Sequence, residues 1–224
     1  MDYADWNPIY ELIRADFGYD RAGDERARDE LALHAQPFDL DRLDVDSVTV
    51  AIAGGARSLD EELDVAAAAD VVFAASTAAD VLDRADVRVD LLVTDLDKNP
   101  ETAVTMTREG RPAAVHAHGD NVGLLRRVVP RMDCTNVLAT TQVEPTDSVY
   151  NFGGFTDGDR AAFLADHLGA EELVFPGWDF DDPTVSEEKR DKLEWAKRLL
   201  AVLERRRGER FDVLEGYRDD LDVP

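Results

Sequence analysis

The sequence predicts an α/β fold with a mostly parallel sheet, flanked by helices. Two observations lead to this prediction. From residue 47 onward, short apolar runs alternate with helical stretches, and small or acidic residues end most of these runs. Apolar runs without polar alternation, separated by helices, are typical of parallel strands that are buried on both faces.

The segment before these runs predicts amphipathic helices. Trp6 and Tyr10 have helical spacing, and Pro37 is expected to end the second helix. We therefore expect a small helical extension over residues 1–46 that packs on an α/β domain over residues 47–224.

The remaining elements follow in a regular order. The predicted strands are Val48–Ala53, Val71–Ala75, Leu91–Thr94, Ala113–His116, Val137–Ala139 and Leu173–Phe175. The predicted helices are Leu59–Ala69, Ala78–Arg84, Pro100–Arg108, Val122–Val129, Arg160–Leu168 and a long C-terminal helix over Glu187–Arg206. The acidic tail from Glu209 is either frayed or docked. This order predicts a Rossmann-like sheet, whose ligands bind at loops that follow the carboxyl ends of strands.

The net charge excludes some classes of function. The chain has 224 residues, with 49 Asp and Glu against 25 Lys and Arg, and a formal net charge of −24. Such a field repels phosphate, so we expect no nucleic-acid partner and no anionic membrane partner. The 44% hydrophobic content excludes a disordered acidic tail. Asp outnumbers Glu by 33 to 16, and the acidic residues are spread along the chain, which indicates a halophile's cytosolic protein.

Cysteine usage and hydropathy agree with a cytoplasmic location. Cys134 is the only cysteine, so an internal disulfide and a cysteine-based zinc site are excluded. No apolar run approaches the length of about 18 residues that a membrane span needs, and the N-terminal segment is acidic.

A glycine-rich loop follows the first predicted strand. Gly54 and Gly55 let the backbone approach a ligand closely, and the following helix start offers N–H groups to an anion. Arg57 and Ser58 come next, and the arginine strengthens the interpretation as a phosphate-binding loop. The loop matches neither the dinucleotide-binding pattern nor a Walker loop, so an ordinary tight turn remains the alternative.

Paired carboxylates follow the third predicted strand. Residues i and i+2 of an extended segment project to the same side, so Asp95 and Asp97 can bind one or two hard cations. Mg²⁺ takes one or two carboxylates together with substrate phosphates, which suits this pair. Because Asp is abundant, a chance pair is the alternative.

A second polar loop follows the fourth predicted strand and contains His116, His118, Asp120 and Asn121. No third soft ligand accompanies the two histidines, which argues against a transition-metal site. Asp120 would complete a three-carboxylate magnesium site, with one histidine near phosphate or base. Packed, hydrogen-bonded histidines are the alternative.

A glycine-rich segment precedes the helix predicted from Arg160. Gly153 and Gly154 allow it to bend round a phosphate or nucleobase, while Asp157 or Asp159 can instead cap the helix.

An aromatic residue and a carboxylate follow the last predicted strand. Trp178 can stack on a flat heterocycle while Asp179 accepts two N–H bonds from it. A buried Trp beside a solvated Asp is the alternative.

Together these loops resemble a known family. In chain order they read GGARSL, TDLD, HAHGDN, NFGGFTDGDR and GWDF. This set resembles the archaeal type of 6-hydroxymethyl-7,8-dihydropterin pyrophosphokinase over nearly the whole chain and, more distantly, thiamin pyrophosphokinase. HAHGDN and GGFTDGDR are the specific blocks.

The resemblance implies an enzyme that transfers diphosphate from ATP to the hydroxymethyl group of a reduced pterin, with Mg²⁺ as cofactor and AMP as the second product. The pterin diphosphate would feed folate or methanopterin synthesis. The partners implied are these small molecules, and a homodimer is left open. The implied metal ligands are Asp95, Asp97 and Asp120, of which Asp97 and Asp120 are also the catalytic candidates.

Two sets of binding residues complete the expected site. The ATP and phosphate set is Gly54, Gly55, Arg57, Ser58, Lys98, Arg126, Gly153, Gly154, Asp157 and Arg160. The substrate set is His118, Asn121, Asp159, Trp178 and Asp179. Lys98 stands where we expect a glycine in the family, which leaves open whether it contacts phosphate.

Three other functions remain as alternatives. A thiamin-type pyrophosphokinase has similar carboxylate and glycine blocks. A haloacid-dehalogenase-like phosphatase would use Asp95 as its nucleophile, but that motif normally opens its domain, whereas two predicted strands precede Asp95 here. A nucleotide-sensing module without catalysis would release no AMP.

The halophile hypothesis gives a first prediction. We expect the melting temperature to rise steeply between about 0.1 M and 2 M KCl, because salt screens the repulsion between surface carboxylates. Thermal unfolding followed by circular dichroism measures this, and a flat response would contradict the hypothesis.

Overall fold

The fold consists of two compact units, each assembled from two separate stretches of chain. The computed structural model describes residues 1–224, apart from the side chain of Asp220. The first unit comprises Met1–Asp44 and Asp90–Gly153, and the second comprises Val45–Val89 and Gly154–Pro224. Every strand pair within a unit is parallel and helices pack on these strands, so the predicted α/β class is confirmed.

The strands of the first unit are β3 (Leu91–Thr94), β4 (Ala113–Ala117) and β5 (Val137–Thr141), with β4 between the other two. All residues of these strands are buried, as the continuous apolar runs predict. α5 (Pro100–Arg108) follows β3, and α6 (Val122–Val128) follows β4. The loops before α5 and α6 therefore leave the carboxyl ends of neighbouring strands.

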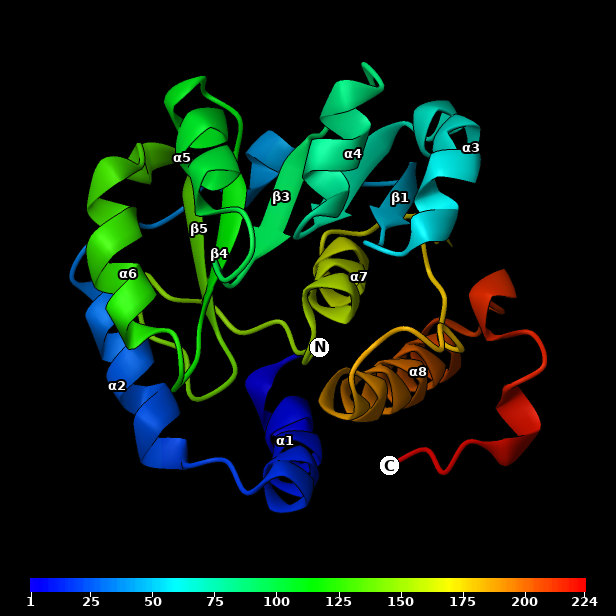
Figure 1. The fold of residues 1–224 in the computed structure, drawn as a ribbon. Helices are drawn as coiled ribbons and strands as arrows, with labels where there is room; N and C mark the ends of the chain where they lie inside the picture. Colours follow the sequence, from blue (N-terminus) through cyan, green and yellow to red (C-terminus); the bar gives the residue numbers. More distant parts are fainter. The chain divides into compact units, whose positions relative to one another are not determined.

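The two N-terminal helices belong to this first unit. α1 (Tyr3–Phe17) buries Trp6 and Tyr10, and α2 (Arg21–Ala32) packs on α6, β4 and β5 (Figure 1). The expectation that Pro37 ends the second helix is wrong. Hydrogen bonds of the i to i+3 type already close α2 at its last turn, before the chain reaches the proline. The domain boundary between residues 46 and 47 stays a prediction.

In the second unit, β1 (Thr49–Ala53) lies between β2 (Val71–Ala75) and β6 (Glu172–Val174). α7 (Asp157–His167) packs on β1 and β2, and α8 (Glu187–Arg207) packs on α7. The other helices of this unit are α3 (Leu63–Ala68) and α4 (Ala78–Arg84).

Two predicted helices differ from the structure at their N-terminal ends. The helix expected over Leu59–Ala69 is a 3-10 helix over Arg57–Glu61 followed by α3. α7 begins at Asp157 rather than Arg160, because a capping box starts the helix earlier. The remaining 3-10 helices are Leu40–Leu43, Val129–Arg131, Cys134–Asn136, Asp212–Leu214 and Arg218–Asp220.

The C-terminal tail is docked on the second unit. Phe211 and Leu214 are buried, and the Phe211 ring lies 4.8 Å from that of Phe175, centroid to centroid. Glu204 accepts hydrogen bonds from the Phe211 N–H (2.5 Å) and the Arg218 guanidinium (2.7 Å). Of the two alternatives left open for the tail, docking is therefore the one observed.

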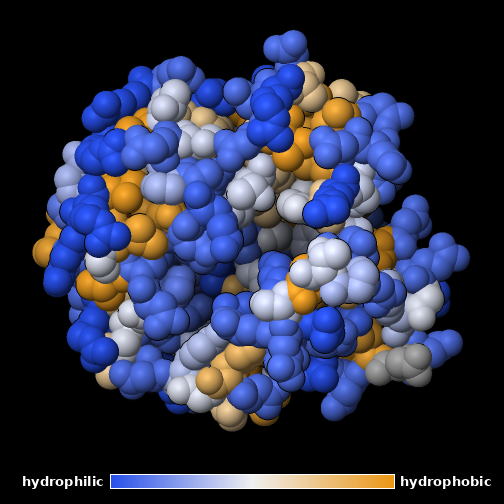
Figure 2. Space-filling view, viewed as in Figure 1, coloured by the Kyte–Doolittle hydropathy of each residue, from blue (hydrophilic) through white to orange (hydrophobic). Residues whose placement is uncertain are grey.

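The face drawn in Figure 2 is mostly hydrophilic, and its hydrophobic residues form separate small patches. Within the described part of the chain, we find no helix with the length and apolar content to cross a membrane.

Candidate active site

The loop after β3 holds Asp95 and Asp97 close together through a sharp turn. The Thr94 hydroxyl accepts the Leu96 N–H (2.9 Å), and the Asp95 carboxylate accepts the Asp97 N–H (3.1 Å). Leu96 between them is buried and has a φ of +70°, a conformation that is rare for a leucine. The expectation of an extended segment is therefore wrong. A turn, and not strand alternation, brings the two carboxylates together.

The two carboxylates affect each other electrostatically. Partial burial, together with the contact and negative charge of Asp95, raises the pKa of Asp97 above its usual range. The ammonium group of Lys98, 3.4 Å from the Asp97 carboxylate, acts in the opposite direction. On its other side, the Asp95 carboxylate lies 3.4 Å from Nε2 of His118.

This pair fits a magnesium ion. Carboxylate oxygens are hard ligands, and a divalent cation between two like charges would relieve the repulsion that raises the pKa of Asp97. No three His, Cys, Asp or Glu side chains among the described residues form a preassembled metal cluster. The role of Asp120 as a third ligand therefore stays a prediction.

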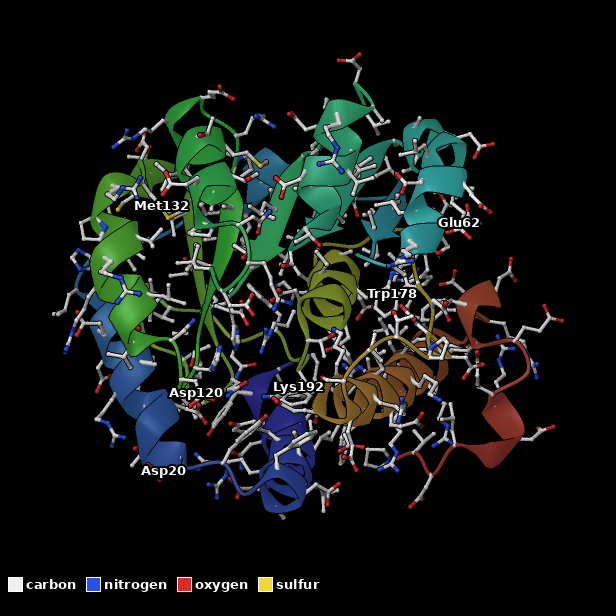
Figure 3. All side chains as sticks on the ribbon, viewed as in Figure 1. Asp20, Glu62, Asp120, Met132, Trp178 and Lys192 are labelled. Carbon is white, nitrogen blue, oxygen red and sulfur yellow. The ribbon has the colours of Figure 1, made fainter. Side chains whose placement is uncertain are left out.

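The two histidines differ in burial, although their rings lie only 6.4 Å apart, centroid to centroid. His116 is buried, and its Nδ1 lies 3.0 Å from the Thr140 hydroxyl on β5, whereas the side chain of His118 is 23% exposed. Asp120 is exposed, in the part of the loop beside the start of α2 (Figure 3). Of the two histidines, His118 is thus the one that a ligand can reach.

Asn121 joins the ends of β3 and β4. Its amide donates to the carbonyl oxygens of Asp95 (3.0 Å) and His116 (2.7 Å), and its oxygen accepts the His118 N–H (3.0 Å). Both amide hydrogens are used within the protein and the side chain is 2% exposed. The hydrogen bonds of Asn121 thus fix the loops after β3 and β4. Its contact with the substrate stays a prediction.

In the second unit, the glycine-rich loop after β1 is bonded to the turn after β6. The N–H groups of Gly54 and Ala56 donate to the carbonyls of Pro176 (2.8 Å) and Gly177 (3.0 Å), so these two are already engaged. A Cβ on Gly54 would lie only 2.3 Å from the Gly177 oxygen. Gly54 is thus required for close backbone contact, which is the tight-turn alternative, while the exposed Gly55 lies outside these bonds.

Trp178 is wedged between β1 and α7. Its indole N–H donates to the Ile52 carbonyl (2.8 Å), and a Cβ on Gly158 would meet its ring at 2.6 Å. The ring is half-buried, and Asp179 beside it is exposed. Phe175 and Phe180 also pack near this ring, at 5.6 Å and 5.7 Å between centroids, which restricts the surface left for stacking.

The two acidic residues at the start of α7 have different surroundings. Asp159 is fully buried and accepts hydrogen bonds from the Thr156 hydroxyl (2.6 Å) and the Phe155 N–H, which caps the helix. Burial raises the pKa of Asp159, against the opposing effect of these bonds. Asp157 pairs with Arg160 at 3.0 Å, where both side chains are largely buried.

The remaining predicted phosphate contacts differ in exposure. Arg57 and Lys98 are exposed, and Ser58 and Gly153 are partly buried. Arg126 on α6 pairs with Glu30 on α2 at 2.8 Å, which raises the pKa of the arginine. Arg126 is therefore engaged with a carboxylate of its own unit.

Some residues that support these loops had no signal in the sequence. Glu62 accepts the Gly177 N–H (2.6 Å) and so holds the turn after β6. Nothing in the pattern separates Glu62 from the other 48 acidic residues, because its role depends on contact with a residue far along the chain.

The parallel α/β fold, with polar loops at the carboxyl ends of its strands, is the architecture of many enzymes that bind phosphorylated small molecules. The model of the family described as 6-hydroxymethylpterin diphosphokinase MptE-like matches residues 32–184. The chain belongs to this family, and the family predicted from the loops is confirmed.

Curated relatives match nearly the whole chain. The 6-hydroxymethyl-7,8-dihydropterin pyrophosphokinase of Methanothermobacter thermautotrophicus is 38% identical over 92% of this chain and 96% of its own. The protein of that name from Pyrococcus furiosus is 36% identical, over 91% and 94% of the two chains. The one from Methanocaldococcus jannaschii is 30% identical, over 91% and 96%.

The close contact at Gly54 gives a second prediction. Gly54→Ala should lower the free energy of unfolding by about 1–3 kcal/mol, because the new methyl group overlaps the Gly177 carbonyl. Gly123→Ala is the control, since a Cβ there meets only the flexible end of Arg127, at 3.3 Å, and alanine favours a helix. Urea unfolding compares the two, and equal stabilities would contradict the prediction.

Proposed function

We propose that this protein transfers diphosphate from ATP to the hydroxymethyl group of 6-hydroxymethyl-7,8-dihydropterin in the presence of Mg²⁺, giving the pterin diphosphate and AMP. The observation that carries the proposal is the Asp95 and Asp97 pair beside His118, in a chain of this family whose relatives with that printed activity match over 90% or more of both sequences.

The chemistry requires positioning and charge neutralisation. The pterin hydroxyl oxygen bonds to the β-phosphorus of ATP, the bond between the β-phosphorus and the α–β bridging oxygen breaks, and AMP leaves with that oxygen. Mg²⁺ held by Asp95 and Asp97, with Asp120 as the third proposed ligand, would neutralise the charge on the phosphate oxygens. The hydroxyl proton passes to a carboxylate, for which Asp97 and Asp120 are the candidates.

The cations of the site differ in their freedom to bind the triphosphate. Arg57 and Lys98 are exposed and suited to phosphate, although Lys98 also lies near Asp97. Arg160 keeps its pairing with Asp157 and acts as part of a nearly buried ion pair. Arg126 would have to break its ion pair with Glu30 before it could bind a phosphate, so it is the least suited of the four cations to this contact.

The residues proposed to bind the pterin are those whose side chains are at least partly exposed. Asp179 can accept two N–H bonds from the heterocycle while the open face of Trp178 stacks on it. Asp159 is fully buried and saturated as a cap, so we propose Asp179 before Asp159 as the acceptor. His118 contributes its exposed edge beside Asp95.

Product analysis tests the proposal directly. The purified protein in about 2 M KCl is incubated with ATP, MgCl₂ and either the reduced pterin alcohol or thiamin, and the products are separated and weighed by mass spectrometry. We expect AMP and pterin diphosphate in equal amounts, and no product from thiamin. Formation of ADP, or of thiamin diphosphate alone, would overturn the proposal.

The paired carboxylates give a further prediction. Asp95→Asn and Asp97→Asn should each lower diphosphate transfer by at least about 100-fold, since each removes a charge needed by the metal. An amide oxygen at position 95 can still accept the Asp97 N–H, so the melting temperature should change little. MgCl₂ should raise the melting temperature of the wild type but not that of these variants, since each variant lacks a proposed metal ligand.

Asp41→Asn is the matched control for these variants. Asp39 and Asp41 have the same spacing and the same hydrogen bond, from the Asp41 N–H to the Asp39 carboxylate at 3.2 Å. This control should keep both the activity and the response to MgCl₂. An active double variant, Asp95→Asn with Asp97→Asn, would refute the metal assignment.

A further inference from the structure

A buried polar cluster connects the N-terminal helices to the loop after β4. Tyr10 on α1, Asp24 on α2 and Gln142 after β5 are each less than 5% exposed. The Asp24 carboxylate accepts hydrogen bonds from the Gly119 N–H (2.8 Å), the Gln142 amide (2.9 Å) and the Tyr10 hydroxyl. One oxygen of this carboxylate therefore binds the backbone of the loop that carries His118 and Asp120.

The other members of the cluster also bond to one another. The Gln142 amide also donates to the Tyr10 hydroxyl (2.8 Å), and the Trp6 indole donates to the Gln142 carbonyl (3.0 Å). The donors that contact Asp24 are neutral, and among the described side chains no Lys, Arg or His pairs with this carboxylate. A buried carboxylate is costly to keep without a cation, so packing alone does not account for an aspartate at this position.

The bond to Gly119 gives the loop after β4 a second point of attachment. Asn121 holds the loop from within, through the His118 N–H. From the opposite direction, α2 approaches so closely that a Cβ on Gly119 would lie 3.3 Å from the carbonyl carbon of Gly23. At this close contact, the Asp24 carboxylate accepts the N–H of Gly119. Gly119 lies directly between His118 and Asp120 in the sequence.

We propose that Asp24 is a positioning residue for the reaction, which places His118 and Asp120 by fixing the Gly119 N–H between them. The inference rests on the proposed function. It assigns a role at the site to one residue of the N-terminal helices. Asp24 precedes residue 32, where the match to the family model begins.

Three variants test this role. Asp24→Leu keeps the branched shape of the side chain in a larger volume and has no acceptor, so the Gly119 N–H loses its partner. Asp24→Asn keeps an oxygen that can accept this N–H. Tyr10→Phe is the matched control, because it weakens the same buried cluster but leaves the bond between Asp24 and Gly119.

The first readout is hydrogen exchange of the Gly119 amide, which does not depend on the reaction. We expect Asp24→Leu to raise its exchange rate at least tenfold, while Asp24→Asn and Tyr10→Phe keep it near the wild-type value. If the leucine variant does not fold, Asp24→Ala provides the same comparison without added volume. Unchanged exchange at Gly119 in the variant that lacks the acceptor would overturn the proposal.

The second readout separates positioning from stability. We expect kcat/KM for the pterin to fall about 10-fold to 100-fold in Asp24→Leu, and Asp24→Asn to restore it to within about threefold. Tyr10→Phe should lower the melting temperature yet keep kcat. Equal losses of kcat in Tyr10→Phe and Asp24→Leu would assign Asp24 a stability role only. If no variant and no wild-type protein acts on the pterin, the proposed function fails while the exchange result still stands.

Discussion

The side chain of Asn121 is the constraint on which the site of the first unit depends. Parallel strands end with backbone groups that no further ladder bond satisfies, and at β3 and β4 this amide binds three of them. The loops after β3 and β4 are thereby both bonded, where they leave their strands, to one rigid amide group. Asp95 and His118 lie near each other because the backbones that carry them are fixed to the same amide.

In the second unit, backbone groups and not a side-chain amide connect the loops at the strand ends. Its loops after β1 and β6 bond directly to each other, which requires glycine at the point where the backbones approach most closely. Trp178 then covers the junction and satisfies the Ile52 carbonyl. This arrangement engages the N–H groups of Gly54 and Ala56 within the unit, so these two groups are not open to an anion.

The sequence predicted the parts of the structure that depend on local pattern. β2 and β3 have the predicted bounds because the polar residues Ser76 and Asp95 directly follow their apolar runs. The sequence correctly placed Asp95 and Asp97 directly after β3. It did not predict the turn between them, because a leucine at position 96 gives no indication of a positive φ. Asp24 could not be found at all: its partners lie in other elements, and it is one of 33 aspartates.

The discontinuous units have a consequence for synthesis on the ribosome. The first unit is complete in sequence once Gly153 has emerged, but β1 still lacks β6, and α7 and α8 do not yet exist. At about 5–20 residues per second, the chain needs roughly 4–14 s more to deliver the rest of the second unit. During that interval β1 and β2, which are strongly apolar, must be kept from pairing with other chains. The high density of carboxylates around them supplies such protection, since like charges keep nascent chains apart.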